Sequence, residues 1–188
     1  METFRDIRDG KAYETVRIGN QTWMAENLAF IPHVGAAAAQ AGIWVYGYDG
    51  TDPAEARSTE NFSTYGCLYD LETALKAVPA GWHLPKEEEW KALAAFFGPG
   101  ADDGNKMKQR SGWKSDSFAT NSSGFSALPG GQRTPLGTFK GLGSTACFWS
   151  ATSFGPDFWQ FYLEDVSKHV RSNPTSKTWG FSVRCIQD

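Results

Sequence analysis

The sequence has few cysteine and histidine residues. Its three cysteines, Cys67, Cys147 and Cys185, are odd in number and lack the CxxC spacing of a structural zinc site. They allow either one disulfide with one free thiol or three buried thiols. The three histidines show no metal-ligand spacing. We therefore expect no metal and no cofactor.

Long hydrophobic runs are also absent. No stretch approaches the ~18 apolar residues of a membrane-spanning helix, so we expect no membrane insertion. The first ten residues carry charges where a signal peptide has its apolar core. The chain is expected to be intracellular at synthesis, exported without a cleaved signal, or a trimmed form.

An excess of positive charge is missing as well. The net charge is −3, which argues against a nucleic-acid partner held through its phosphates. The longest basic cluster consists of Lys106, Lys108 and Arg110, which we expect on a solvated loop or turn.

Periodicity predicts a hairpin near the N-terminus and two helices further on. Residues 11–18 alternate with period 2, and Gly19-Asn20 can turn the chain into a return strand at 21–25. The clearest helix is expected at residues 86–97, because an i, i+3, i+4, i+7 apolar stripe begins at Trp90. A weaker helix is expected at residues 71–77.

The rest of the chain is predicted to be irregular or strand. Residues 31–64 are interpreted as an irregular insertion, with a short helix allowed through the alanines at 36–39. After residue 98 the pattern indicates only loops and strands. We therefore expect one α+β domain over residues 1–188, with two helices, short antiparallel sheets and long loops.

The sequence shows no catalytic constellation. No histidine lies beside a nucleophile in a known arrangement, and the serine-hydrolase and P-loop motifs are absent. Glu87, Glu88 and Glu89 are consecutive helix residues that point in different directions, so they cannot face one substrate together. We expect no enzymatic activity.

Aromatic residues are concentrated near the C-terminus. Positions 146–181 hold nine of them. Successive side chains of a strand alternate between its faces, so Phe158, Trp159, Phe161 and Tyr162 cannot all share one face. Either that strand is buried on both faces or some of these rings are exposed recognition residues.

Several ordered motifs run through most of the chain. They are Asp9-Gly10-Lys11, Gln21-Thr22-Trp23-Met24-Ala25-Glu26-Asn27-Leu28, Tyr65-Gly66, Gly81-Trp82-His83-Leu84-Pro85, Ser111-Gly112-Trp113, Gly124-Phe125-Ser126-Ala127-Leu128-Pro129-Gly130-Gly131, Phe148-Trp149-Ser150 and Gly180-Phe181-Ser182-Val183-Arg184-Cys185. In this order they resemble the Fibrobacter succinogenes major paralogous domain family.

The resemblance implies a C-type-lectin-like fold, and some members look like the variable proteins of diversity-generating retroelements. In those proteins a fixed framework displays exposed positions that are rewritten by mutagenic reverse transcription. If this surface is diversified, stability must come from elsewhere, and we expect it from a tryptophan framework of Trp23, Trp82, Trp90, Trp113 and Trp149. The candidate variable, ligand-binding positions are Phe148, Phe158, Gln160, Tyr162, Lys168, His169, Ser172, Thr178 and Trp179.

The sequence departs from related patterns in three places. The Glu-Pro-Asn, Gln-Pro-Asp and Trp-Asn-Asp motifs of calcium-dependent sugar binding are absent. Many relatives carry a cysteine where this chain has Val78, which puts the usual disulfide of Cys185 in doubt. Formylglycine-generating enzymes share this fold and use a pair of catalytic cysteines. The three cysteines of this chain include no pair placed for that oxidation.

These observations favour a non-enzymatic module that binds a protein or glycan ligand on another surface. A structural component of a phage tail or cell surface is the alternative, and a formylglycine-generating-type enzyme is the less favoured one. The resemblance implies a location on the bacterial surface or a phage particle. The oligomeric state stays open.

Overall fold

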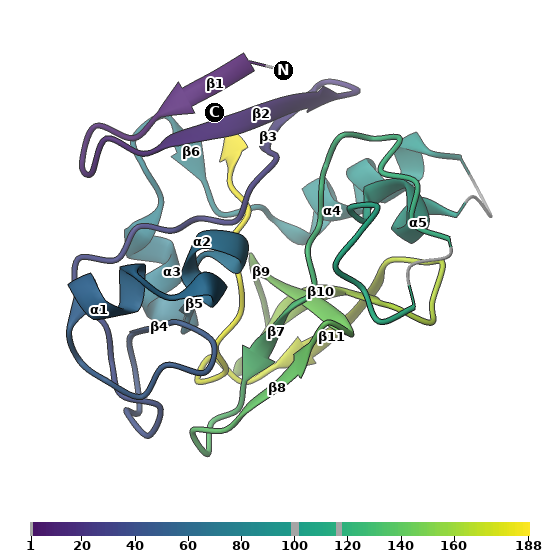
Figure 1. Ribbon diagram of the computed structural model, residues 1–188. Helices are drawn as coiled ribbons and strands as arrows, with labels where there is room; N and C mark the ends of the chain where they lie inside the picture. Colours follow the sequence, from purple (N-terminus) through teal and green to yellow (C-terminus); the bar gives the residue numbers. More distant parts are fainter. Residues whose placement is uncertain (1, 99–101, 116–117) are drawn as a thin grey trace.

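The structure is a computed structural model that describes residues 2–98, 102–115 and 118–188. It is a mixed α+β fold, as predicted, with two five-stranded sheets toward opposite ends of the molecule (Figure 1). A two-stranded pair, β4 (Ile43–Trp44) and β5 (Leu68–Tyr69), completes the strand structure of the described residues. The two termini lie at the same end, beside the first sheet (Figure 1).

The first sheet has the strand order β1-β2-β3-β12-β6. Its strands are β1 (Glu2–Arg5), β2 (Ala12–Ile18), β3 (Gln21–Met24), β12 (Ile186–Gln187) and β6 (Trp82–His83). The predicted hairpin is confirmed, with Ile18 paired to Gln21 across the turn. Gly19 has a φ of 61°, a left-handed conformation that favours glycine in this tight turn.

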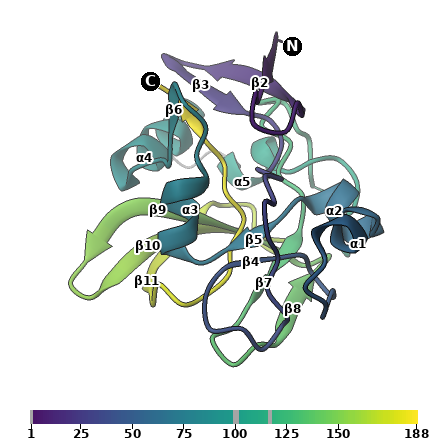
Figure 2. The same cartoon turned by 90° about the vertical axis from the view of Figure 1, so that its left-hand side faces the viewer.

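The second sheet has the order β11-β10-β9-β7-β8. Its strands are β7 (Gly130–Arg133), β8 (Phe139–Leu142), β9 (Thr145–Phe154), β10 (Asp157–Glu164) and β11 (Arg171–Thr175). The yellow C-terminal segment runs past this sheet toward the first one (Figure 2). On its way Phe181 exchanges backbone hydrogen bonds with Tyr69, and Ser182 O accepts one from Trp149 N at 3.3 Å. The C-terminal segment thereby connects the second sheet with the first sheet, to which it contributes β12.

The described residues contain five helices, so the expectation of only two was wrong. They are α1 (Pro53–Arg57), α2 (Glu60–Tyr65), α3 (Leu71–Ala77), α4 (Glu87–Phe96) and α5 (Asp103–Met107). The two predicted helices are confirmed as α3 and α4. Each has a local start signal: the Asp70 side chain caps α3 by accepting from Thr73 N, and Glu89 Oε2 accepts from Lys86 N at 2.7 Å in α4.

The alanine run at 36–39 forms a turn, not a helix. Buried Arg133 explains this, because its Nε and Nη2 donate to Ala37 O at 2.9 and 2.6 Å and so use a carbonyl that a helix would occupy. The Arg133 guanidinium also lies 4.0 Å from the Trp44 ring centre. Helix α1 forms later in the insertion, where Asp52 caps and Pro53 occupies the first turn.

The region after residue 98 was predicted to hold only loops and strands, and α5 corrects this. The basic cluster beside it lies only in part on a solvated loop, where Arg110 is exposed. Lys106 lies in α5, and Lys108 is 2% exposed, with its Nζ donating to Ser167 O at 2.6 Å. Burial lowers the pKa of Lys108. Its single charge holds two loops together inside the molecule.

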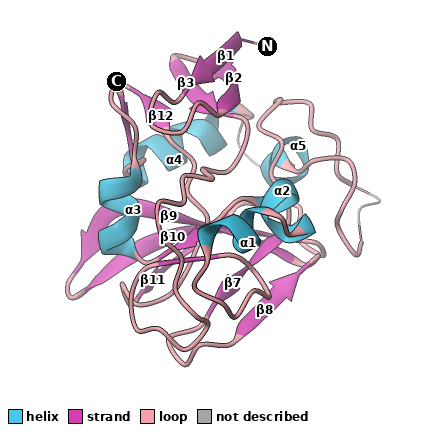
Figure 3. Ribbon diagram, turned by 60° about the vertical axis from the view of Figure 1, so that its left-hand side comes forward, coloured by secondary structure: helices cyan, strands magenta, loops and turns pink. Residues whose placement is uncertain are grey.

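Two core clusters lie on opposite faces of β9. The first cluster contains Trp149 and lies where α3 packs against β9. The second cluster contains Trp90 and lies where α4 packs against β9. Figure 3 shows both helices beside this strand. All five framework tryptophans are buried, at 0–7% exposure. The expectation that these five tryptophans form a buried framework is therefore confirmed.

The three cysteines are free and buried, which decides between the two alternatives left open by the sequence. Among the described residues, no helix has the length and apolar character needed to cross a membrane.

Candidate recognition surface

The side chains of three predicted site residues on β10 lie on one side of the second sheet. Phe158, Gln160 and Tyr162 are spaced by two, so their side chains share a face. Gln160 pairs with Trp149 of β9, and Tyr162 pairs with Cys147. Because Trp149 and Cys147 belong to the first core cluster, this is the face toward α3. Phe158 and Tyr162 are half-buried against that cluster.

Gln160 is more buried than its prediction as an exposed position requires. It is 9% exposed, and its Nε2 donates to Asn173 Oδ1 of the neighbouring strand β11 at 3.0 Å. Its Oε1 has no hydrogen-bond partner among the described residues. A buried acceptor without a hydrogen-bond partner costs free energy. Gln160 Oε1 is such an acceptor in the free protein.

Trp179 joins this face from the loop that follows β11. Its ring stacks on buried Phe181 with centroids 5.9 Å apart and an interplanar angle of 27°. Lys140 of the edge strand β8 places its Nζ 4.9 Å from the Trp179 ring centre. We call the set Lys140, Phe158, Gln160, Tyr162, Asn173 and Trp179 the β10 surface. Thr178, also predicted, is exposed beside it.

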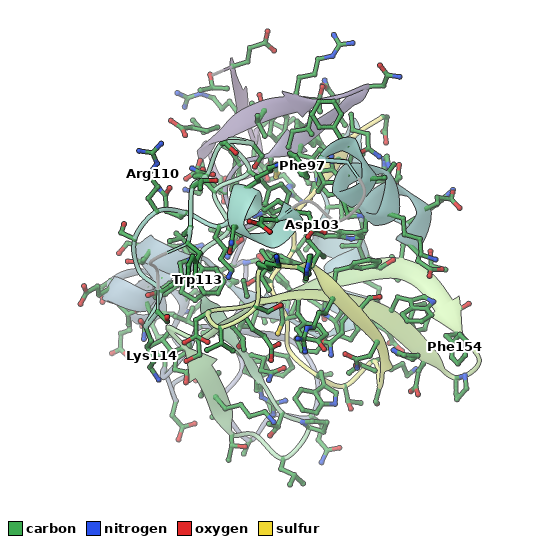
Figure 4. All side chains as sticks on the ribbon, turned by 90° about the vertical axis from the view of Figure 1, so that its right-hand side faces the viewer. Phe97, Asp103, Arg110, Trp113, Lys114 and Phe154 are labelled. Atoms are coloured by element: carbon green, nitrogen blue, oxygen red, sulfur yellow. The ribbon has the colours of Figure 1, made fainter. Side chains whose placement is uncertain are left out.

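Lys168 and His169 are exposed but held by α5. Lys168 Nζ lies 3.2 Å from Asp102 Oδ1, and His169 Nδ1 lies 3.1 Å from Asp103 Oδ1. Gly104 N donates to Lys168 O at 2.9 Å. Figure 4 shows Asp103 well away from Phe154, which marks the tip of the β9–β10 hairpin. These two predicted residues therefore form a separate group at the other end of β10.

Two predicted positions do not belong to the β10 surface. Phe148 is 1% exposed and stacks on Trp90 with centroids 5.5 Å apart, so its assignment as a variable surface residue was wrong. It pairs with Phe161, which places it on the α4 face of the sheet. Ser172 also pairs with Phe161; it is exposed, but on that opposite face.

The aromatic run of β10 is partly exposed on both faces, because only Phe161 is buried and the other three rings are half-buried. Phe161 is 4% exposed and stacks on Trp90 at 5.2 Å. Trp159 is half-buried and makes an edge contact with Phe154 at 5.3 Å. Phe154, at 57% exposure, is the most open ring of this hairpin.

Sequence reasoning missed Lys140 and Asn173. Lys140 precedes the aromatic-rich region, and its position depends on β8 pairing with β7, which in turn joins β9. Asn173 is recognisable only from the register that sets it opposite Gln160. Neither residue had a local signal in the sequence.

The β10 surface combines aromatic rings, amides and one ammonium group. Such a surface can stack on a ligand, hydrogen-bond to it and attract an anion. The described residues hold no group of three or more His, Cys, Asp and Glu side chains that could bind a metal ion. His83 lies elsewhere, between Glu89 Oε1 at 2.8 Å and Asp188 Oδ1 at 2.7 Å, where it joins α4 to the chain end.

Comparison with known proteins gives one family. The family model described as the Fibrobacter succinogenes major domain matches residues 16–187, which is most of the chain. No curated protein matches the chain, and no solved structure does.

Proposed function

The chain belongs to the Fibrobacter succinogenes major domain family, and we propose that it is a non-enzymatic binding module with a C-type-lectin-like fold. Its ligand is a protein or glycan on another surface. The module acts at the surface of a bacterium or of a phage particle. The β10 surface makes the contact.

One observation carries this proposal: residues from three separate segments gather on one side of the second sheet. Lys140 comes from β8, Tyr162 from β10 and Trp179 from the loop after β11. Half-buried aromatic side chains lose little conformational entropy when a ligand covers them, which suits them as binding anchors. A few such anchors supply most of the free energy of binding in protein interfaces.

The separation of this surface from the framework favours a diversified protein of the retroelement type. Trp149 and Trp90 are fully buried on the two faces of β9, so they keep the sheet in place. Substitutions at Tyr162 or Trp179 leave those contacts intact. A module of this design can change its ligand without losing its fold.

The test is a binding screen with matched variants. The labelled protein is applied to a glycan array and to a panel of bacterial cells, followed by Tyr162→Ala and Trp179→Ala. The control is Phe96→Ala, which removes a 60% exposed ring from α4. We expect the two β10-surface variants to lose at least tenfold in affinity and the control to bind as the parent does.

Two results would contradict the proposal. Equal binding by all three variants would move the contact away from the β10 surface. Self-association of the purified chain in analytical ultracentrifugation, lost in Trp179→Ala, would instead favour the structural assembly role.

A further inference from the structure

A polar cavity lies away from the β10 surface, between α2, the first sheet and the loops around residues 109 and 126. Its volume is about 370 Å³, within the range of small-molecule sites. Figure 1 shows α2 beneath strand β2. Glu14 of β2 and the segment that follows β3, residues 25–27 and 29, line the cavity opposite α2. We call it the α2 cavity. The residues that bear on its chemistry are Lys11, Glu14, Glu26, Gln109, Ser126 and Arg184.

The floor of the α2 cavity carries a buried positive charge. Arg184 is 1% exposed, and its Nε donates to Asn27 Oδ1 at 2.7 Å while Nη2 donates to Ser126 O at 2.9 Å. Nη1 donates to two backbone carbonyls. All these acceptors are neutral, and no carboxylate of the described residues lies within 4.0 Å of the guanidinium. One N–H of Nη2 remains without an acceptor among the described residues.

The Arg184 guanidinium also lies 4.6 Å from the Phe125 ring centre and 5.7 Å from that of Phe148, but it has no carboxylate partner among the described residues. A buried cation without a paired anion is costly. Burial lowers the pKa of Arg184 to about 9, although the negative charge of Glu26 acts in the opposite direction. An anionic group entering the cavity would therefore gain from a positive charge that the protein leaves unneutralised.

The wall beside Arg184 is built from strained backbone. Ser126 has a φ of 55° and Asn121 a φ of 48°, in the left-handed region that side chains disfavour. The two residues hold one another: Asn121 Oδ1 accepts from Ser126 N, and Asn121 Nδ2 donates to Ser126 Oγ, both at 2.9 Å. Strain of this kind persists where the surrounding contacts enforce it and is frequent at ligand sites.

The rim of the α2 cavity carries two carboxylates and one ammonium group. Glu26 Oε2 accepts from Glu14 N at 2.8 Å, and Glu26 Oε1 lies 3.7 Å from Lys11 Nζ. The Glu14 carboxylate itself makes no hydrogen bond or ion pair with any described residue. The cavity thus has a positive floor, a free carboxylate at its rim and equal numbers of cationic and anionic side chains.

We propose that the α2 cavity binds a small zwitterion of the free α-amino acid class. The ligand carboxylate points to the Arg184 floor, and the ligand ammonium lies between Glu14 and Glu26. A simple anion would be repelled by the two rim carboxylates, and a simple cation would be repelled by the floor. This site is independent of the β10 surface and of the function proposed for it.

The experiment is a thermal-shift screen of the whole chain against the twenty free α-amino acids, followed by calorimetric titration of the best one. At a ligand concentration about 100 times Kd, we expect Tm to rise by several degrees. Glu14→Gln should weaken binding at least tenfold, because it removes the rim charge without touching a buried group. Glu88→Gln, an exposed carboxylate on α4, is the matched control and should leave Kd unchanged.

Three results would overturn the proposal. The first is that no amino acid raises Tm at millimolar concentration. Another is the N-acetylated form of the best amino acid binding as tightly as the free form, which would show that the ammonium is not recognised. The third is a neutral monosaccharide raising Tm where amino acids do not. The absence of amino-acid binding would leave the glycan-array result at the β10 surface unaffected.

Discussion

The ammonium group of Lys140 lies 4.9 Å from the centre of the Trp179 ring, and this contact joins the edge strand β8 to the loop that follows β11. That ring also stacks on Phe181, which packs against Trp149 with ring centroids 4.5 Å apart. One column of aromatic rings therefore runs from the core to the surface. Its outer end can take part in binding, while its inner end holds the sheet.

The two ends of this column should differ in their effect on stability. Trp149→Ala removes a fully buried ring whose Nε1 donates to Tyr69 O, and should lower the free energy of unfolding by about 3–5 kcal/mol. Trp179→Ala removes a half-buried ring and should cost about 1–2 kcal/mol. Urea denaturation measures both. Equal losses would assign Trp179 to the core.

The β10–β11 loop depends on a glycine of α5. A Cβ at Gly104 would lie 2.9 Å from the His169 backbone carbonyl carbon, closer than such atoms pack. We expect Gly104→Ala to speed hydrogen exchange at residues 167–170 and to lower Tm by several degrees. Gly155→Ala is the comparison: its added methyl meets no atom within 4 Å, but the φ of 61° at this position disfavours a side chain. It should therefore lower Tm without a selective rise in exchange at residues 167–170.

His83 should make stability depend on pH near neutrality. Burial lowers its pKa, but hydrogen bonds to Glu89 and Asp188 outweigh burial and the net pKa is raised. The stabilising contribution is therefore present below the unfolded pKa of about 6.5 and is lost as pH rises through the folded pKa. Because these side chains are partly exposed, the effect is small.

The measurement compares the free energy of unfolding of the parent with that of His83→Gln across pH 5 to 9. The difference between them should shrink as pH rises. A constant difference would mean that His83 contributes through packing and neutral hydrogen bonds alone.

The three cysteines should resist thiol reagents in the folded protein. Burial raises the pKa of Cys67 and of Cys147 to about 12 and also raises that of Cys185. At pH 8 we expect an aromatic disulfide reagent to react with the native chain only as fast as it unfolds. In denaturant, three thiols per chain should be titrated. Two missing thiols in denaturant would reveal a disulfide instead.

If the locus is diversified, its changes should follow the faces of β10. Deep sequencing of a population grown from one clone should show substitutions at the codons for Tyr162 and Trp179. The codons for Phe148 and Phe161 should stay constant, because both rings stack on Trp90 inside the core. Changes spread evenly over these four codons would exclude selection for this framework, and a uniform locus would mean a fixed ligand or a silent retroelement.

Local pattern was enough to predict several elements. Alternation located strand β2, and the apolar stripe located α4, because these signals lie within one or two turns of the chain. The shorter helix α3 was also predicted from the sequence. The alanine run failed as a helix signal. The intrinsic helical preference of alanine is worth only about tenths of a kcal/mol per residue. The buried guanidinium of Arg133, which is distant in the sequence, donates hydrogen bonds to the carbonyl groups of Ala37 and Ala39.

The sequence by itself determined the α+β class, the tryptophan framework and the aromatic character of the C-terminal region. Only the tertiary structure decided which aromatic residues are core. Phe148 and Tyr162 look alike in sequence, but the register of β9 against β10 sends them to opposite faces. The burial of Lys108 and Arg184 was equally hidden, since Ser167 O, which accepts from Lys108, and the carbonyls that accept from Arg184 Nη1 lie about 60 or more residues away in the sequence. Burial is set by such distant pairings, and no local pattern of residues records them.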